Sequence, residues 1–366
     1  MKMNSEAWKP FVAMVFIDFA FAVVNILLKK VLQEGMNPLV IITYRLSVSC
    51  VFLAPIAFFW ERNGRPKLTF RILCYLFLSA LFGTSLTQYF YLLGIQDTSA
   101  TFACAFINMV PVVTFIMALP FGLETVNIKC NRGRAKILGT VVCIGGALLL
   151  TLYKGKPLFN YSQSEAAAAS HMVSAVKQNS APRNTERWTT GVIALIVGTL
   201  FWSSWFLLQS KIGKKYPCQY SSTAIMTFFG AIQSAVLSLS TSQHSSVWIL
   251  KGNMQILTVV FSGMVGSGLC FVGLSWCVKK KGPVFTASFS PLVQIMAAMI
   301  DIPILHEPLH VGSLMGSILV MGGLYILLWG KNMEKQNHEN MTKPCQQDGE
   351  IMGQEPQMQH IVVSSD

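Results

Sequence analysis

The chain has 366 residues, of which 52% are hydrophobic and only 12% carry a charge. Soluble domains usually carry about 25% charged residues, so this composition excludes an ordinary soluble protein and favours a membrane protein. The net charge is +12, but the basic residues gather between apolar runs and form no stripe interleaved with aromatic residues, so no nucleic-acid partner is expected.

Ten apolar runs follow one another along the chain, and each approaches the roughly 20 residues that cross a bilayer as a helix. We expect membrane spans at residues 9–32, 38–60, 70–94, 100–122, 136–153, 189–209, 220–240, 254–278, 284–305 and 311–330. No cleavage site of small residues follows the first run, which we therefore expect to remain as a span. The predicted fold class is an all-α polytopic membrane protein embedded in the lipid bilayer.

The basic residues also predict how the chain is oriented. If the N-terminus is cytosolic, most of the 28 Lys and Arg residues fall in loops on the cytosolic side. The positive-inside rule therefore predicts that both termini are cytosolic. We expect the plasma membrane rather than the vacuolar membrane.

The two halves of the chain repeat each other. The glycine pairs Gly145-Gly146 and Gly322-Gly323 lie in the fifth and tenth runs, and Pro111 and Pro291 lie in the fourth and ninth. Such glycines also occur simply because they let helices pack closely. Several matches in register favour a duplication, and because five spans is an odd number, the second copy starts on the opposite face. Inverted repeats of this kind are typical of secondary transporters, which bind substrate near the midplane.

These observations divide the chain into four parts. We expect a first five-helix repeat at 1–153, a flexible outer loop at 154–187, a second five-helix repeat at 188–331 and a disordered cytosolic tail at 332–366. The loop contains the sequon Asn160-Tyr161-Ser162, and Asn160 is a candidate glycosylation site because the loop is expected outside the cell.

A series of motifs resembles the plant Walls-Are-Thin-related family, the nodulin-like, EamA-type branch of the drug/metabolite transporter superfamily. The motifs are Tyr44-Arg45, Leu53-Ala54-Pro55, Arg65-Pro66-Lys67-Leu68-Thr69, Asn108-Met109-x-Pro111, Val126-Asn127-Ile128-Lys129, Ser275-Trp276-Cys277, Lys281-Gly282-Pro283-Val284-Phe285 and Trp329-Gly330-Lys331. The resemblance covers about residues 11–331. It implies a ten-span carrier of small organic solutes without a cofactor, with amino acids the most frequent substrates and auxin-like compounds the substrates of some members.

The chain departs from that family pattern at two places. Leu274 stands where the family has glutamine, and His306-Glu307 stands where it usually has Gly-Glu. Leu274 removes a polar group from an expected passage wall, so the resemblance does not fix the substrate.

Four amides inside the predicted spans are candidate substrate-binding residues: Gln88, Asn108, Asn25 and Gln294. An amide both donates and accepts hydrogen bonds, which suits the two charged ends of a zwitterion. The alternative is that these side chains bond across helices and hold the bundle together.

Two further residues are candidates for the same site. Arg45, the basic residue well inside a span, can bind a substrate carboxylate through two hydrogen bonds. Alternatively it pairs with an acid or extends to the membrane surface. Tyr91, one helical turn from Gln88, either stacks on the substrate or belongs to the aromatic belt at the membrane edge.

Acidic residues at membrane depth are candidates for gating or proton relay. Asp18 and Asp301 lie inside spans, where each either relays a proton or forms a structural pair. Glu124 and Glu307 lie at matching ends of the two repeats and are interpreted as gate or anchor residues.

One motif indicates a different class of protein. The segment His306-Glu307-Pro308-Leu309-His310 fits the H-E-x-x-H signature of zinc proteases. Pro308 disfavours the helix that would bring both histidines onto one face, and no third ligand is evident. We therefore expect a transporter rather than an enzyme, without a metal. The sequence leaves open a channel or sensor of the same fold, the identity of the solute and whether the chain forms homo-oligomers.

Overall fold

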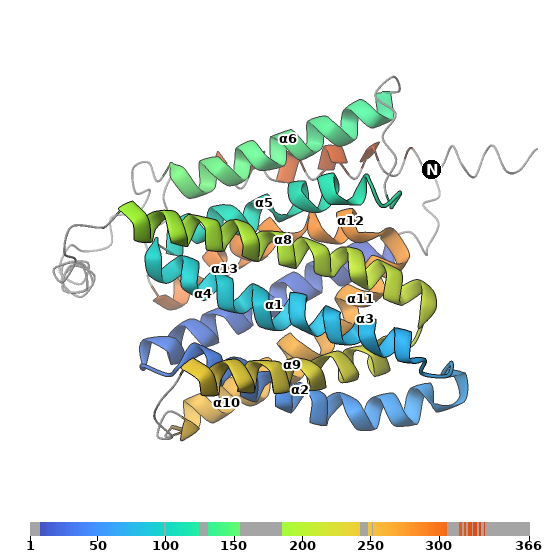
Figure 1. Cartoon of the computed structure of the whole chain (residues 1–366). Coiled ribbons are helices and arrows are strands. Elements are labelled where there is room, and N and C mark those ends of the chain that lie inside the picture. The colour runs from blue at the N-terminus through green and yellow to red at the C-terminus, as the bar shows by residue number, and fades with distance from the viewer. Residues whose placement is uncertain are drawn as a thin grey trace, which may run out of the picture.

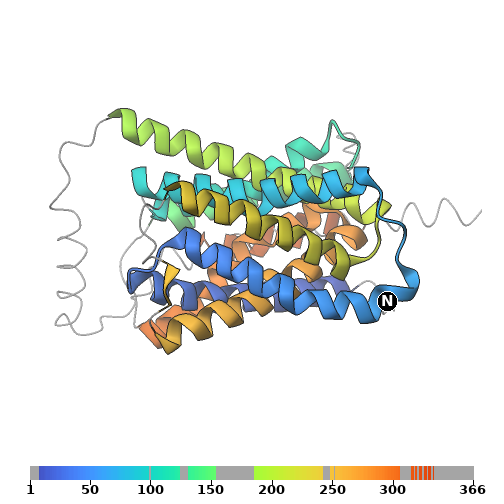
Figure 2. The same ribbon diagram turned by 60° about the horizontal axis from the view of Figure 1, so that its bottom comes forward.

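The structure is a computed structural model, and it describes residues 8–98, 100–123, 131–153, 185–241, 248–250, 252–305 and parts of 315–333. Within these residues every regular element is a helix. Figures 1 and 2 show the long helices lying beside one another along a common direction.

The first half of the chain forms five helical spans. These are α1 (Lys9–Gln33), α2 (Pro38–Glu61) with the short turn η1 (Arg62–Gly64), a continuous third span made of α3 (Phe70–Ala80), η2 (Leu81–Leu86) and α4 (Thr87–Asp97), then α5 (Ala100–Ala118) and α6 (Asn131–Leu152). The fourth helix ends before the predicted residue 122, because residues 119–122 form a turn.

The second half follows the same order. Its helices are α8 (Thr185–Lys215), α9 (Gln219–Thr241), a continuous eighth span made of α10 (Asn253–Phe261), η4 (Ser262–Leu269) and α11 (Cys270–Lys281), and a ninth span made of α12 (Pro283–Ala287) and α13 (Ser290–Leu305). The described residues between 315 and 333 are also helical.

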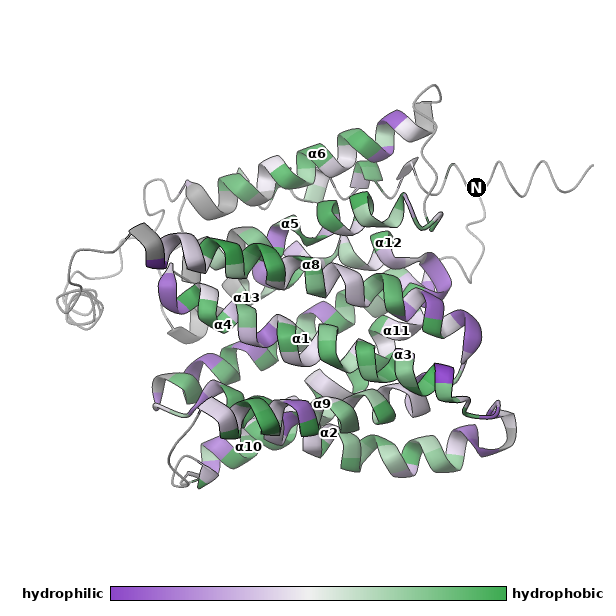
Figure 3. Ribbon diagram, in the orientation of Figure 1, coloured by the Kyte–Doolittle hydropathy of each residue, from purple (hydrophilic) through white to green (hydrophobic). Residues whose placement is uncertain are grey.

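Length and composition suit these helices to a bilayer. Six of them are long and apolar enough to span it: Lys9–Leu32, Pro38–Glu61, Phe70–Asp97, Arg187–Lys215, Gln219–Thr241 and Asn253–Lys281. Large apolar side chains also cover the outside of the bundle, with Phe16, Phe59 and Phe70 between 71% and 80% exposed. Figure 3 shows hydrophobic residues along the helices and hydrophilic ones towards their ends. Such a surface is stable against lipid rather than water.

One end of the bundle gathers basic residues, and we call it the basic end. Here the Nζ atom of Lys215 lies 4.7 Å from the ring centroid of Tyr75, and that of Lys211 lies 4.4 Å from the ring centroid of Phe121. Phe121 follows α5, so α5 starts at the opposite end, whereas α12 starts after Lys281 at the basic end. The fourth and ninth spans therefore run in opposite directions, as an inverted repeat requires.

The third and eighth spans share an unusual feature in their middle. Each contains a stretch of π-helix, η2 in one and η4 in the other. A π segment interrupts the regular α-helical bonding and is frequently found at functional sites. Because the two spans are equivalent in the two halves, the shared π segments are a structural counterpart of the sequence repeat.

The ninth span is interrupted, whereas its sequence predicts one continuous helix over 284–305. The chain makes a turn at Ser288 and Phe289 before α13 begins. Pro291 explains the interruption, since it has no N–H to donate to the carbonyl four residues earlier and its ring clashes with that carbonyl. Proline is accommodated at the first turn of a new helix. The equivalent Pro111 lies inside α5, which stays continuous.

Small residues bring the two halves into close contact. A Cβ atom on Gly139 of α6 would lie 2.5 Å from Leu327 N and 2.8 Å from Gly323 O, so these two spans touch through their backbones. Between the other spans, α2 packs mainly on α9 and α4 packs mainly on α8. The two repeats therefore form one bundle rather than two separate ones.

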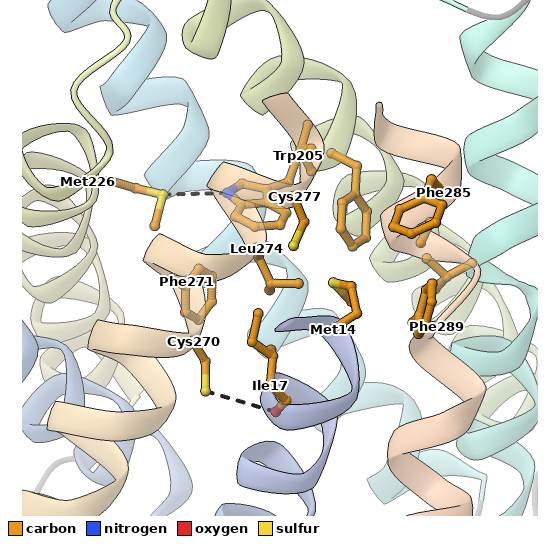
Figure 4. Packing of buried hydrophobic residues seen from close by; sticks show 14 of the residues in the cluster. Met14, Ile17, Trp205, Met226, Cys270, Phe271, Leu274, Cys277, Phe285 and Phe289 are labelled. Carbon is orange, nitrogen blue, oxygen red and sulfur yellow. Dashed lines mark hydrogen bonds between the residues drawn. The ribbon is translucent and has the colours of Figure 1, made fainter. Parts of the chain in front are cut away.

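The centre of the bundle is an aromatic and aliphatic cluster built from both halves. Figure 4 shows Trp205, Phe271, Leu274 and Met14 among its members, with Trp205 fully buried. The Trp205 indole N–H donates to Met226 Sδ at 3.4 Å. Leu274 is 4% exposed and packs as a core residue.

Candidate functional site

Two of the predicted amides meet where the fourth and ninth spans pack together. Asn108 Nδ2, on α5, donates to Gln294 Oε1, on α13, at 3.0 Å. The Asn108 side chain is 2% exposed, and Gln294 is half-buried. The structure thus joins two residues that are 186 positions apart and come from different repeats.

The positions of the amides follow the inverted repeat. Asn108 lies three residues before Pro111, and Gln294 lies three residues after Pro291. The symmetric counterpart of this pair is Ser288 with Thr114, but Ser288 donates instead to its own helix, to the carbonyl of Val284 at 2.7 Å. The hydrogen bond between Asn108 and Gln294 therefore has no symmetric counterpart between Ser288 and Thr114. The side chains at the contact between the two spans do not follow the symmetry of the repeat.

The other two amides lie elsewhere. Gln88 is half-buried on α4, which packs mainly on α8 and also contacts α5. Asn25 is exposed on α1. The structure does not bring either of them into hydrogen-bond contact with the Asn108–Gln294 pair.

Tyr91 connects two helices. Its hydroxyl lies 3.1 Å from Thr199 Oγ1, which joins α4 to α8. Thr199 also donates to the carbonyl of Leu195 at 2.8 Å. This contact joins α4 of the first half to α8 of the second half. The Tyr91 hydroxyl therefore has a hydrogen-bond partner within the protein.

Arg45 lies on α2, which packs on α9 and η4. Its side chain is half-buried, and Nε is buried without a hydrogen-bond partner. Within the described part of the chain no ion pair to Arg45 is formed. A guanidinium group with unused donors at this depth can bind an anionic group, but Arg45 is not joined to the amide pair.

Asp18 is a buried acid on α1. Its side chain is 2% exposed, and its Oδ2 atom has no hydrogen-bond partner. It faces the eighth span, where it lies within electrostatic reach of the thiols of Cys270 and Cys277. This carboxyl does not belong to the Asn108–Gln294 pair.

Several predicted site residues lie outside what the structure describes. This applies to Glu124, Glu307, Asn160, the segment His306–His310 and the side chain of Asp301. Among the described residues, no group of three His, Cys, Asp or Glu side chains is arranged to hold a metal.

Sequence reasoning missed a polar cluster at the basic end, which we call the basic-end latch and define as Glu61, Arg65, Tyr220 and Ser221. The Glu61 carboxylate accepts the backbone N–H of Tyr220 at 3.1 Å, the N–H of Ser221 at 2.7 Å and the Ser221 hydroxyl at 2.6 Å. Arg65 Nη2 donates to Ser221 Oγ at 2.9 Å and to the Ala57 carbonyl at 3.2 Å.

The basic-end latch joins the end of α2 to the start of α9. Glu61 ends α2 and caps the start of α9, where free N–H groups and the helix dipole favour a negative charge. Next to it, Cys218 Sγ donates to the Gly64 carbonyl at 3.8 Å. Burial raises the pKa of the Cys218 thiol, and the nearby Glu61 charge raises it further. In the sequence, Glu61 and Arg65 appear only as charged residues at the end of an apolar run. Such residues by themselves indicate a membrane boundary and no particular partner.

A groove of about 810 Å³ lies between α6 and the tenth span. Its lining is mostly apolar and comprises Arg134, Ala135, Ile137, Leu138, Val141, Tyr325, Ile326 and Trp329. None of the predicted site residues lines it. The groove is therefore distinct from the amide pair.

Comparison with known proteins agrees with this architecture. The model of the EamA-like transporter family matches residues 9–152 and 189–329. The chain is 49% identical to the WAT1-related protein At3g30340 of Arabidopsis thaliana, covering 97% of this chain and 96% of the relative, and 48% identical to the WAT1-related protein At4g01440, covering 92% and 91%. A solved crystal structure shares the fold with a TM-score of 0.62 at 12% identity, covering 86% of this chain and 98% of that one. The chain therefore belongs to the EamA-like transporter family and is a multi-pass membrane transporter of small solutes.

Proposed function

We propose that this transporter carries amino acids and that the Asn108 and Gln294 amides bind them. The observation that supports the proposal is the buried amide–amide hydrogen bond between two equivalent helices of the inverted repeat. Substrate sites of inverted-repeat carriers lie at the interface between the repeats. The pair occupies that interface.

Amides suit the chemistry of a zwitterion. The N–H groups of Asn108 and Gln294 can donate to a carboxylate, and their carbonyl oxygens can accept from an ammonium group. Neither side chain adds a net charge that would favour an anion or a cation alone. In the present arrangement the amides bond to each other, so an amino acid would replace that bond when it enters. We therefore interpret the arrangement as the closed, substrate-free one.

Access to the site is proposed to alternate between the two ends. The basic end is proposed to face the cytosol, following the positive-inside rule. The basic-end latch joins α2 to α9 there, so opening towards the cytosol requires Glu61 to release the start of α9. The π segments η2 and η4 and the break before Pro291 supply places where the spans can bend. The plasma membrane is the proposed location.

Counterflow in liposomes tests this proposal. Purified protein is reconstituted with an unlabelled amino acid inside, and uptake of a panel of ¹⁴C-labelled amino acids is measured. We expect saturable counterflow, because a carrier couples the exit of unlabelled solute to the entry of labelled solute through one binding site, whereas an open channel lets the two move independently. Asn108→Ala should reduce it strongly, while Gln96→Ala, which removes an exposed amide at the end of α4, should leave it unchanged. Normal counterflow in a correctly folded Asn108→Ala variant would contradict the site.

A further inference from the structure

Asp18 is a buried carboxyl group in the middle of α1 that the amide site does not use. Its side chain is 2% exposed, and its Oδ2 atom has no hydrogen-bond partner. Helix α1 packs mainly on α13 and α11, with further contacts to α10 and η4. The carboxyl is therefore enclosed by helices rather than directed to either end of the bundle.

The residues around Asp18 on α1 are apolar or aromatic. Met14, one turn earlier, is 1% exposed and belongs to the central cluster. Phe21, one turn later, packs edge-on against Phe271 with ring centroids 6.3 Å apart. Such surroundings leave the carboxyl little contact with water, in line with its 2% exposure.

The nearest titratable groups do not stabilise a negative charge on Asp18. These are Cys270 and Cys277 on α11. Their S–H groups are directed elsewhere: Cys270 Sγ donates to the Ile17 carbonyl at 4.0 Å, and Cys277 Sγ donates to the Pro10 carbonyl at 3.8 Å (Figure 4 draws the first of these).

Positive charges are also too far away to pair with Asp18. Helix α10 and η4 contain no titratable residue, and the titratable residue of α13 is Asp301. On α11 the lysines come at residues 279–281, beyond the thiol of Cys277. On α1 itself, Lys9 and Lys29 lie about 13 Å and about 16 Å away along the helix by its rise per residue. Within the described residues no cation pairs with Asp18.

We propose that Asp18 is a proton-binding site, that its carboxyl carries a proton in this closed arrangement, and that the transport cycle moves this proton together with the solute. An ionised carboxylate without a counter-ion or a donor is strongly disfavoured in an apolar site with little access to water. A neutral carboxyl requires neither a counter-ion nor a donor to stabilise a charge. Ionisable residues inside membrane spans mark proton pathways in many transporters.

The proposed step balances as a proton transfer. On one side of the membrane, a proton from water forms an O–H bond with a carboxylate oxygen of Asp18. The neutral side chain then allows the helices to close. When the bundle opens to the other side, that O–H bond breaks and the proton returns to water. The coupling to solute depends on the proposed amino-acid transport, whereas the proton site itself does not.

Infrared spectroscopy tests the proton site without any transport. The protein is reconstituted in lipid nanodiscs at pH 7, and the C=O stretch of protonated carboxyl groups is recorded for the wild type, Asp18→Asn and Glu34→Gln. Glu34 is an exposed acid at the end of the same helix. We expect a protonated-carboxyl band that Asp18→Asn removes and Glu34→Gln retains. The absence of any band that depends on Asp18 would overturn the proposal.

Flux measurements test the coupling. An acidic solution outside the liposomes should accelerate wild-type uptake of the ¹⁴C-labelled amino acids several-fold, and Asp18→Asn should abolish this acceleration while counterflow without a pH gradient persists. Asp18→Glu should restore part of it. If wild-type counterflow is measurable but the gradient does not accelerate uptake, the coupling is wrong. If no amino acid is transported at all, the proposed substrate is wrong, and the infrared band alone decides the proton site.

Discussion

The Glu61 carboxylate accepts the Ser221 hydroxyl at 2.6 Å and thereby ties the end of α2 to the start of α9. These helices are the second spans of the two repeats. The same carboxylate accepts two backbone N–H groups of α9, so a single side chain satisfies three donors. The contact is therefore a candidate for the closure that must break when the basic end opens.

Replacing Glu61 should loosen this closure. Loss of a helix-capping side chain typically costs about 0.5–2 kcal/mol, so we expect Glu61→Ala to increase the population that is open at the basic end. The readout is alkylation of the neighbouring Cys218 by a maleimide, measured by peptide mass spectrometry. The plateau rate at high pH, where the thiol is fully ionised, should rise in Glu61→Ala and stay unchanged in Glu34→Ala at the opposite end. Equal rates in the wild type and Glu61→Ala would show that the contact does not close the bundle.

The pH dependence of that alkylation reports the environment of Cys218. Burial and the Glu61 charge raise the pKa of this thiol, and Arg65 and Lys279 oppose the increase. Because only the thiolate reacts, alkylation should require a higher pH than for a free cysteine. Glu61→Gln should move the midpoint to lower pH, and Arg65→Gln should move it to higher pH. The midpoint reports the pKa and the plateau reports access, so the two effects are separable.

A close backbone contact between α6 and the tenth span predicts a stability difference between two glycines. Gly139→Ala places a Cβ atom 2.5 Å from Leu327 N, so the helices must move apart. Overpacking of this kind costs about 1–3 kcal/mol. Gly145 in the same helix has no atom within 4 Å of such a Cβ, which makes Gly145→Ala a matched control. Thermal unfolding in detergent should show a lower midpoint for Gly139→Ala only, and equal midpoints would contradict the contact.

The hydroxyl of Tyr91 is expected to contribute to packing rather than to substrate binding. Tyr91→Phe removes the bond to Thr199 between α4 and α8, and the net loss should be about 1 kcal/mol of stability. The KM for transport should not change. A raised KM with unchanged stability would instead place Tyr91 in the binding site.

The membrane spans were predictable because long apolar runs and short basic loops are local properties of the sequence. The runs at 9–32 and 38–60 agree with α1 and α2 to within one residue at each end. The π segments were not predictable from local patterns. The glycines within them, Gly83 and Gly263, pack closely against Trp205 and Val48 of other helices, and such contacts cannot be read from a local pattern in the sequence. The break before Pro291 depends on its surroundings in the same way, since Pro111 leaves α5 continuous.

The candidate site was predictable as a set of residue types but not as a constellation. Asn108 and Gln294 stood out because amides are costly at membrane depth without a partner. Which amides pair could not be derived, since their contact joins residues 186 positions apart. The latch was missed for the same reason. Glu61 finds its partners 159 and 160 positions later in the chain, and no local pattern indicates this.

Counterflow kinetics of Asn108→Ala, Gln294→Ala and the double variant test the central claim most directly. Each amide that binds a charged end of the substrate should contribute about 1.5–3 kcal/mol, so each single variant should lose roughly 10- to 100-fold in kcat/KM. Because the two amides hold one substrate, the double variant should lose less than the product of the single losses. Wild-type kcat/KM in both single variants, with normal folding and membrane insertion, would contradict the claim that the amides of α5 and α13 bind the transported solute.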